Sequence, residues 1–273
     1  MPVFDRSVSP IRLTECGQEY IKCAEKIMDI QNGFESYLGD IQQMKAGSLR
    51  LGASNFFVSY VLPPVLTHFK LLYPEVDVNL TEANSLLLEK LLFAGELDLV
   101  ADNNVFDENV YTKEPFFNEQ LLLSVPKWCP ANKAAQPYAL DLNGVMTGCH
   151  MIDDKLSVPL ALFAEEPFIM LRRGNDTRSR ADVMCRENGL NPNIILELDQ
   201  LATAFHVCCH GMGITFVSDL LVKEVKNDEN VVYYKLDGKH AARTNYFFYK
   251  YGKYHTRPMN EFLRMASESA AVR

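Results

Sequence analysis

Polar side chains at one strand-to-helix junction could hold a small charged molecule. Ser54 and Asn55 stand between a strand-like run and a helix-like run, so they offer a hydroxyl group and backbone N–H groups that no helical carbonyl pairs. The start of a helix is a ready site for an anion. The same two residues would also serve as an ordinary N-cap, and the residues themselves leave both interpretations open.

Two further stretches follow strand-like runs in the same way. Asp102 and Asn103 come at the carboxyl end of one run, where the ligands of open α/β sheets tend to bind. Asn103 could hydrogen-bond a ligand or belong to an Asx turn. Arg172 and Arg173 follow another run and precede a helix. An arginine there could clamp a carboxylate, or both could be solvated surface.

The run Cys208-Cys209-His210 raises the question of metal or redox chemistry. Adjacent residues on a helix point in different directions, and three ligands in a row cannot easily surround one ion. A reactive thiol needs exposure and a lowered pKa. Buried core thiols are therefore the favoured interpretation, for this run and for Cys149-His150, and we predict no metal site.

No arrangement typical of an enzyme is present. The sequence has no GxSxG, Walker or GxGxxG motif, and Gly211-x-Gly213 is too short for a dinucleotide fingerprint. His68, His206 and His210 have no obvious carboxylate or nucleophile partner in the sequence. We therefore predict a protein that is not an enzyme and that needs no cofactor.

The composition narrows the class of protein further. The 273 residues allow two domains or one large one. A net charge of −8 argues against a general polyanion binder, because phosphate attraction needs clustered Lys and Arg. The seven cysteines form no CxxC pair, which predicts reduced thiols. Without a secretory signal or an apolar run of roughly 20 residues, the predicted location is the cytoplasm, with no membrane partner.

Apolar residues at heptad spacing predict a long helix over residues 14–46. Thr14 suits its N-cap and Gly47 its C-cap. Two sets of residues offset by three form an a/d seam: Tyr20, Ile27, Phe34 and Ile41, and Cys23, Ile30, Tyr37 and Met44. Such a seam either packs on its own domain or pairs with another chain. The length of the helix favours pairing, and hence a dimer.

The rest of the chain alternates strand-like and helix-like runs. Strands are predicted at 48–53, 76–80, 97–101, 119–125, 168–171, 194–198, 213–217, 231–236 and 246–251. Helices are predicted at 55–73, 85–94, 178–188, 200–209 and 258–266. This order predicts an α/β fold with two similar lobes and right-handed crossovers. Two connections between the lobes would form a hinge with a cleft beside it, and we expect the last strands to return to the first lobe.

Four segments resemble one known family. They are FDRSVSPIRLTECGQEYIKCAEKI near the start, GSLRLGASNFFVSYVLPPVLTHFKLLYPEVDVNL, GELDLVAD, and TRSRADVMCRENGLNPNIILELDQLATAFHVCCHGMGITFV. Together they look like a LysR-type transcriptional regulator, and the resemblance covers essentially the whole chain. Its most specific parts are FDR…RLTE-G, LRLG, LPP-L--F---YP and GELD.

The resemblance implies two periplasmic-binding-protein-like lobes with a hinge, preceded by a long linker helix. Residues 1–13 would be the remnant of a winged-helix wing and 14–46 the linker and dimerisation helix. Residues 48–123 and 224–273 would form the first regulatory lobe, and 124–223 the second. The helices that precede the wing, including the recognition helix that enters the major groove, are missing from the sequence. DNA is therefore expected as a partner only through that missing head, with Arg6 or Arg12 of the wing touching the DNA backbone or minor groove.

The implied function is effector binding and oligomerisation in a DNA-binding regulator, as a homodimer or homotetramer. Effectors of the family lie over the turn at 54–55, which favours the anion-site interpretation. Phe56 replaces a more polar residue often found there, so the effector is predicted to carry an apolar part beside a carboxylate. The predicted effector-binding residues are Ser54, Asn55, Phe56, Asn103, Arg172, Thr177, Gln200 and Phe216.

Two alternatives remain open. A solute-binding protein that feeds a transporter has similar lobes and a similar hinge, although it would predict a signal peptide and a monomer. Some relatives sense oxidants with a cysteine pair in the second lobe, so redox sensing at 208–209 stays a possible role.

Overall fold

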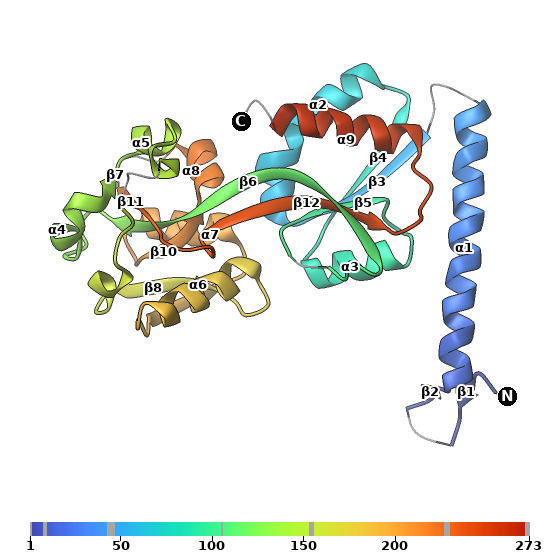
Figure 1. Cartoon of the computed structure of the whole chain (residues 1–273), viewed down its shortest axis with the longest axis horizontal. Coiled ribbons are helices and arrows are strands. Elements are labelled where there is room, and N and C mark those ends of the chain that lie inside the picture. Colours follow the sequence, from blue (N-terminus) through green and yellow to red (C-terminus); the bar gives the residue numbers. More distant parts are fainter. Residues whose placement is uncertain are drawn as a thin grey trace.

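The chain folds into two α/β lobes joined by two long strands, with a long helix beside them (Figure 1). The computed structural model describes residues 2–7, 10–42, 47–104, 106–152, 156–226 and 230–270. The predicted α/β class and the two lobes are confirmed. Within the described ranges, no helix is both long and apolar enough to cross a membrane.

The first lobe is a sheet covered by helices on both faces. Its strands run in the order β4-β3-β5-β12-β6, with β3 parallel to β4 and β5 and with β12 antiparallel to β5. Helices α2 and α9 cover one face and α3 the other (Figure 1). Leu49 and Leu51 pack under α2 and α9, while Gly52 faces α3, as the alternation of a strand buried on both faces requires. The elements are β3 (Gly47–Ala53), a π-helical turn (Phe57–Val61), α2 (Leu62–Leu72), β4 (Val76–Glu82), α3 (Ser85–Phe93), β5 (Leu99–Asp102), β12 (Ala242–Lys250) and α9 (Arg257–Ala270).

The strand β6 (Tyr111–Pro126) runs through both lobes. Its residues 111–120 pair antiparallel with β12, and its residues 121–126 pair with strands of the second lobe. It therefore begins well before the predicted start at 119. The prediction missed the first half of β6 because this half contains Pro115, and a proline argues against a central strand. The structure accommodates Pro115 opposite a register shift between Asn245 and Tyr246.

The second lobe continues the sheet and adds a parallel pair of strands, β8 with β9. In this lobe, β10 and β11 flank the end of β6, and β11 also pairs with β7. Its elements are α4 (Asn132–Ala135), β7 (Ala139–Leu140), α5 (Leu142–Met146), β8 (Pro167–Leu171), α6 (Asp176–Glu187), β9 (Asn193–Leu198), α7 (Leu201–Cys209), β10 (Thr215–Ser218), α8 (Asp219–Val225) and β11 (Val231–Lys235), with 3-10 turns at 136–138, 149–151 and 160–163.

The placement of β11 corrects one predicted boundary. Residues 224–273 were all expected in the first lobe, but β11 pairs with residues 122–126 of β6, and Tyr234 and Leu236 belong to the apolar core of the second lobe. The chain returns to the first lobe only with β12. The reason is pairing with a partner distant in sequence, which the local pattern of an apolar strand does not specify.

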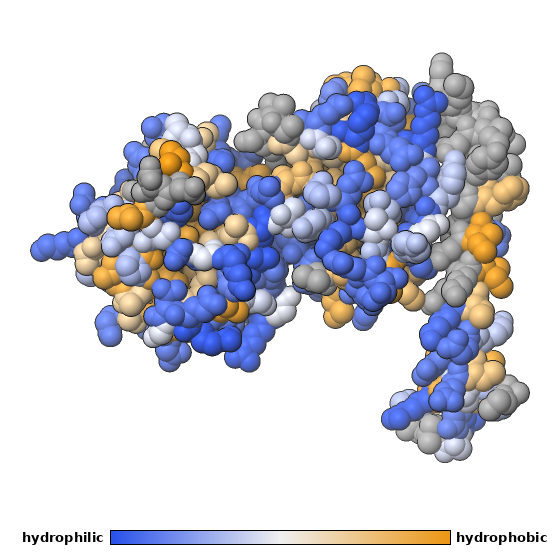
Figure 2. All heavy atoms as spheres, in the orientation of Figure 1, coloured by the Kyte–Doolittle hydropathy of each residue, from blue (hydrophilic) through white to orange (hydrophobic). Residues whose placement is uncertain are grey.

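Helix α1 (Glu15–Gln42) follows a short hairpin of β1 (Phe4–Asp5) and β2 (Arg12–Leu13). The Gly17 N–H donates to Thr14 Oγ1 over 2.9 Å, so the predicted N-cap is confirmed. Several seam residues are exposed in this single chain: Tyr20 (62%), Ile27 (65%), Ile30 (74%) and Phe34 (57%). Figure 2 shows apolar surface on this helix. The side chains of Tyr37, Ile41 and Met44 lie outside what the structure describes.

Candidate functional site

A cavity of about 520 Å³ lies where the two lobes face each other. The first lobe contributes the ends of β3 and β5 and the start of α3, and the second contributes the loop after β8 and the start of α6. Seven of the predicted effector-binding residues line the cavity: Ser54, Asn55, Phe56, Asn103, Arg172, Thr177 and Gln200. They come from segments that are far apart in the chain, and the tertiary fold brings these segments together.

The helix start at 54–57 contributes backbone donors and an apolar wall. The helical residues begin at Asn55, and the Val58 N–H donates to the Ser54 carbonyl over 3.0 Å. Among the described residues, the Ser54 hydroxyl forms no hydrogen bond to the first turn, and no side chain caps the π-helical turn Phe57–Val61 within this helix. Such an uncapped start favours an anion. Asn55 Nδ2 donates to Glu82 Oε1 over 3.0 Å. Phe56 lines the cavity with a side chain that is otherwise buried against the rings of Phe57 and Tyr60.

Asp102 is the most buried acid of the cavity, with 1% of its surface exposed. Its Oδ1 accepts the N–H groups of Asn103 (2.7 Å) and Asn104 (2.9 Å), so the predicted Asx turn exists. Its Oδ2 is buried and has no hydrogen-bond partner among the described residues. Burial raises the pKa of Asp102 above its ordinary value and Asp176 adds to the rise, while the two N–H groups and the Ser85 hydroxyl oppose it.

The two arginines after β8 differ in their partners. Arg172 Nε lies 3.4 Å from Asp199 Oδ1 in an exposed pair. Arg173 is also exposed, and it forms no ion pair with another described residue. Its guanidinium therefore offers two parallel N–H donors to a carboxylate. Gln200 is exposed at the start of α7.

Arg243 is the main cavity residue that the sequence prediction missed. It lies on β12, and its side chain is 1% exposed. Nε donates to Glu119 Oε1 over 2.6 Å, and Nη1 donates to Asp176 Oδ2 over 3.0 Å and to Thr177 Oγ1 over 2.8 Å. The sequence feature that could have identified it is a single arginine within the aromatic strand RTNYFFY. A charged side chain that points inward from a strand needs a buried partner.

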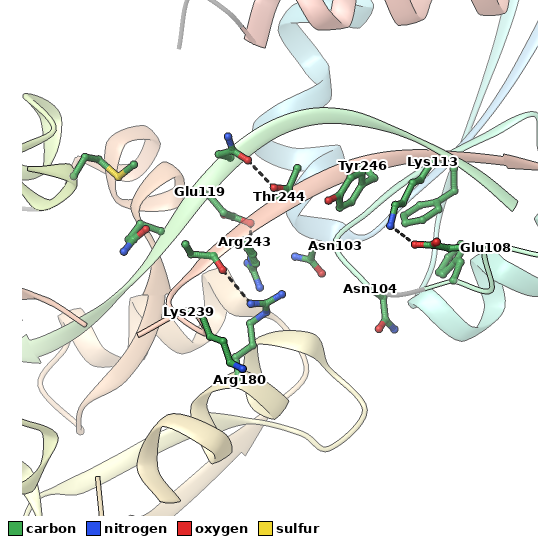
Figure 3. A pocket seen from close by; sticks show the side chains of 16 residues that line it. Asn103, Asn104, Glu108, Lys113, Glu119, Arg180, Lys239, Arg243, Thr244 and Tyr246 are labelled. Carbon is green, nitrogen blue, oxygen red and sulfur yellow. Dashed lines mark hydrogen bonds and ion pairs between the residues drawn. The ribbon is translucent and has the colours of Figure 1, made fainter. Parts of the chain in front are cut away.

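Figure 3 shows the residues that line a second cavity, of about 540 Å³. Arg243 and Asn103 line both cavities. When the Asn103 amide oxygen faces Arg243, it accepts from Nη1 and Nη2 at 3.3 Å each. Arg180 lines the second cavity from α6 and pairs with Asp176 over 2.7 Å. Arg243 thus connects both lobes at the strands that cross between them.

Comparison with known families identifies the fold and its family. The sequence matches the family described as LysR substrate binding domain over residues 42–143 and 148–271. The chain belongs to this family.

Individual relatives of this LysR chain agree with that assignment. It is 27% identical over 277 residues to the uncharacterized HTH-type transcriptional regulator YcgK of Bacillus subtilis, which covers 98% of this chain and 81% of YcgK. The cofactor-binding domain of the Cbl transcriptional regulator matches with a TM-score of 0.66 at 23% identity, over 83% of this chain and 90% of that one. The CcmR regulatory domain of Synechocystis PCC6803 in complex with 2-PG matches with a TM-score of 0.66 at 19% identity, over 82% and 97%. These two structures support the periplasmic-binding-protein-like fold.

One predicted effector residue of the LysR chain does not reach the cavity. Phe216 on β10 is 3% exposed and stacks on Phe168 with 6.4 Å between ring centroids, in the core of the second lobe. The period of two along a strand gives two faces but does not say which of them meets the cavity. The prediction failed for that reason.

The cysteines of the second lobe have the character of core residues. Burial raises the pKa of the Cys208 thiol to about 12 and that of Cys209 to about 11. Cys208 Sγ donates to the Ser124 carbonyl over 3.3 Å. Both shifts are opposite to those that activate a thiol, so the geometry disfavours a redox role for this pair. No group of three metal-ligating side chains occurs in the described part of the LysR chain.

Proposed function

We propose that this LysR chain senses a small anionic metabolite, and that the metabolite binds in the cavity between the lobes. The observation that carries the proposal is the meeting of an uncapped helix start from the first lobe with Arg173 from the second. Both features favour a carboxylate or another anion. Phe56 adds an apolar surface beside them, which suits an effector with an apolar part.

Effector binding would act by changing how the lobes pack. A ligand shifts a conformational equilibrium only if it binds one arrangement better than another. An anion held between the helix start at 54–57 and Arg173 favours the arrangement in which both are within reach. The two strands that cross between the lobes, β6 and β12, would absorb the movement.

The N-terminal segment supplies the proposed connection to DNA and to a second chain. Arg6 and Arg12 are exposed on and beside the hairpin of β1 and β2, where they could contact the DNA backbone. The exposed seam of α1 would pair two chains, as a homodimer or within a homotetramer. In this proposal, effector-driven movement of the lobes changes how such pairs meet an operator. The relatives support a regulator over a solute-binding protein.

Calorimetric titration with a panel of aliphatic and aromatic carboxylates tests the proposal. At least one should bind, and Ser54→Ala and Arg173→Ala should each weaken it, Arg173→Ala by roughly tenfold through loss of a charge-assisted hydrogen bond. Arg186→Ala is the matched control, because Arg186 is an exposed arginine that does not line the cavity. Binding that is unchanged in both cavity variants would place the effector elsewhere.

A further inference from the structure

Some of the charged side chains that line the cavity form ion pairs, and others form none. Asp176 is held by Arg243 and Arg180, and Asp199 lies beside Arg172. Three lining groups then remain without an ion-pair partner among the described residues: Arg173, Glu82 and Asp102. Glu82 only accepts a hydrogen bond from Asn55. Among the described residues, the cavity lining therefore presents one cation and two carboxylates without an ion-pair partner.

Asp102 is the described residue of the cavity lining whose buried carboxylate lacks a hydrogen-bond donor at one oxygen. Its carboxylate is buried, and Oδ2 has no hydrogen-bond partner among the described residues. A buried acceptor left unpaired is costly, and native structures pair nearly all such groups. Because Asp102 lines the cavity, a donor on the bound effector can supply the missing bond.

We propose that the effector is a small zwitterion, an amino acid or a close analogue, whose ammonium group bonds Asp102 Oδ2 while its carboxylate meets the helix start at 54–57 and Arg173. This inference rests on the proposed function of the cavity. The ligand then supplies one positive and one negative group to a site that presents an unpaired acid and an unpaired arginine. Asp102 becomes the residue that selects amino acids from other small carboxylates.

An ammonium group suits Asp102 better than a hydroxyl group does. A hydroxyl would satisfy the hydrogen bond but leave the buried negative charge uncompensated. Burial and the neighbouring Asp176 both raise the pKa of Asp102, so the ionised carboxylate is at a disadvantage until a cation arrives. An N⁺–H···O⁻ bond is also about twice as strong as a bond between neutral groups.

The placement of the two ends also explains how such a ligand could be sensed. Asp102 ends β5 in the first lobe, whereas Arg173 follows β8 in the second. The two charged groups of an α-amino acid are attached to the same carbon atom, so both can be bound only when the lobes are close together. A carboxylate without the ammonium group could bind Arg173 and leave Asp102 unsatisfied.

Matched ligands on the unaltered protein test the inference. Each series keeps one side chain and varies the α-substituent: phenylalanine, phenyllactate and phenylpropanoate, or leucine, hydroxyisocaproate and isocaproate, extended to the other common amino acids. Calorimetry should show, in at least one series, that the amino compound binds roughly tenfold or more tightly than both analogues. An unsubstituted carboxylate that binds as tightly as the amino acid overturns the inference.

The variant Asp102→Asn should remove this preference, because the amide keeps the shape but loses the charge. Asp77→Asn is the control, since Asp77 is exposed on β4 and does not line the cavity. If Asp102→Asn does not fold, the ligand series on the unaltered protein still decides. Carboxylates that bind through Arg173 without any preference for the amino group would refute the zwitterion and retain the proposed function. Failure of every compound in every series would refute both.

Discussion

At the scale of single residues, Arg243 holds the elements around the cavity together through buried ion pairs and hydrogen bonds. Its guanidinium is buried between Glu119 of β6 and Asp176 of α6, and it also donates to Thr177. Glu119 in turn accepts hydrogen bonds from Asn245 and Ser218. Removing one partner from such a network leaves a buried charge without compensation, which costs more than the pair itself contributes.

We expect Arg243→Ala to lower the free energy of unfolding by about 3–5 kcal/mol, because the buried Glu119 would lose its ion-pair partner. Urea unfolding followed by circular dichroism measures the change. Arg264→Ala is a matched control: Arg264 also bridges two carboxylates, Glu261 and Glu268, but on the exposed face of α9. Its loss should change stability little. Equal losses in the two variants would contradict a buried network at the hinge.

At the scale of elements, a close backbone approach fixes β8 against the start of β10. The Ile214 N–H donates to the Pro167 carbonyl, and the Ile169 N–H donates to the Ile214 carbonyl, each over 2.8 Å. A Cβ atom on Gly213 would lie 2.7 Å from the Pro167 carbonyl oxygen. Backbone cannot give way as a flexible side chain can, so only glycine fits here. This contact positions β8, and β8 leads directly to Arg172 and Arg173.

Gly213→Ala should therefore separate β8 from the chain before β10 and lower the free energy of unfolding by about 1–3 kcal/mol, the usual cost of overpacking. Thermal unfolding, with the same carboxylate titrations as above, should show both lower stability and weaker effector binding. Met212→Ala changes the exposed neighbouring residue and should have little effect on either. If Gly213→Ala matches Met212→Ala, the contact between these two segments is not the constraint we describe.

At the scale of the whole molecule, the two lobes and α1 differ in where their apolar residues are buried. The lobes bury their apolar residues within the chain, and β6 contributes side chains to the apolar cores of both lobes. Helix α1 instead leaves Ile27, Ile30 and Phe34 largely exposed. A heptad seam that is exposed in one chain can be buried against a second copy, by knobs-into-holes packing.

We expect the protein to be a dimer or larger assembly in light scattering, and we expect the double variant Ile27→Glu, Ile30→Glu to shift it towards a monomer. Like charges placed in a buried seam would repel and would also be desolvated. Met28→Glu serves as the control, because Met28 is an exposed apolar residue on α1 that lies outside both seam sets. A monomeric unaltered protein would rule out pairing through α1.

Local sequence signals predicted much of the candidate site. Ser54, Asn103 and Arg172 were each found at a junction after a strand, and such junctions are recognised from neighbouring residues alone. Parallel strands carry their carboxyl ends to the same side of a lobe, so side chains that follow them gather without further information. The heptad pattern likewise determined α1 and its N-cap at Thr14.

Only the tertiary structure decided which distant residues meet. Arg243 joins Glu119 and Asp176 across separations of 124 and 67 residues, and no local pattern encodes such a contact. The orientation of Phe216 into the core and the place of β11 in the second lobe depend on the register of β6 with its partners. Sequence determined the elements and their polar ends because these follow from short-range hydrogen bonding and periodicity. The structure determined the buried network and the unpaired oxygen of Asp102, because burial and pairing are properties of the packed chain.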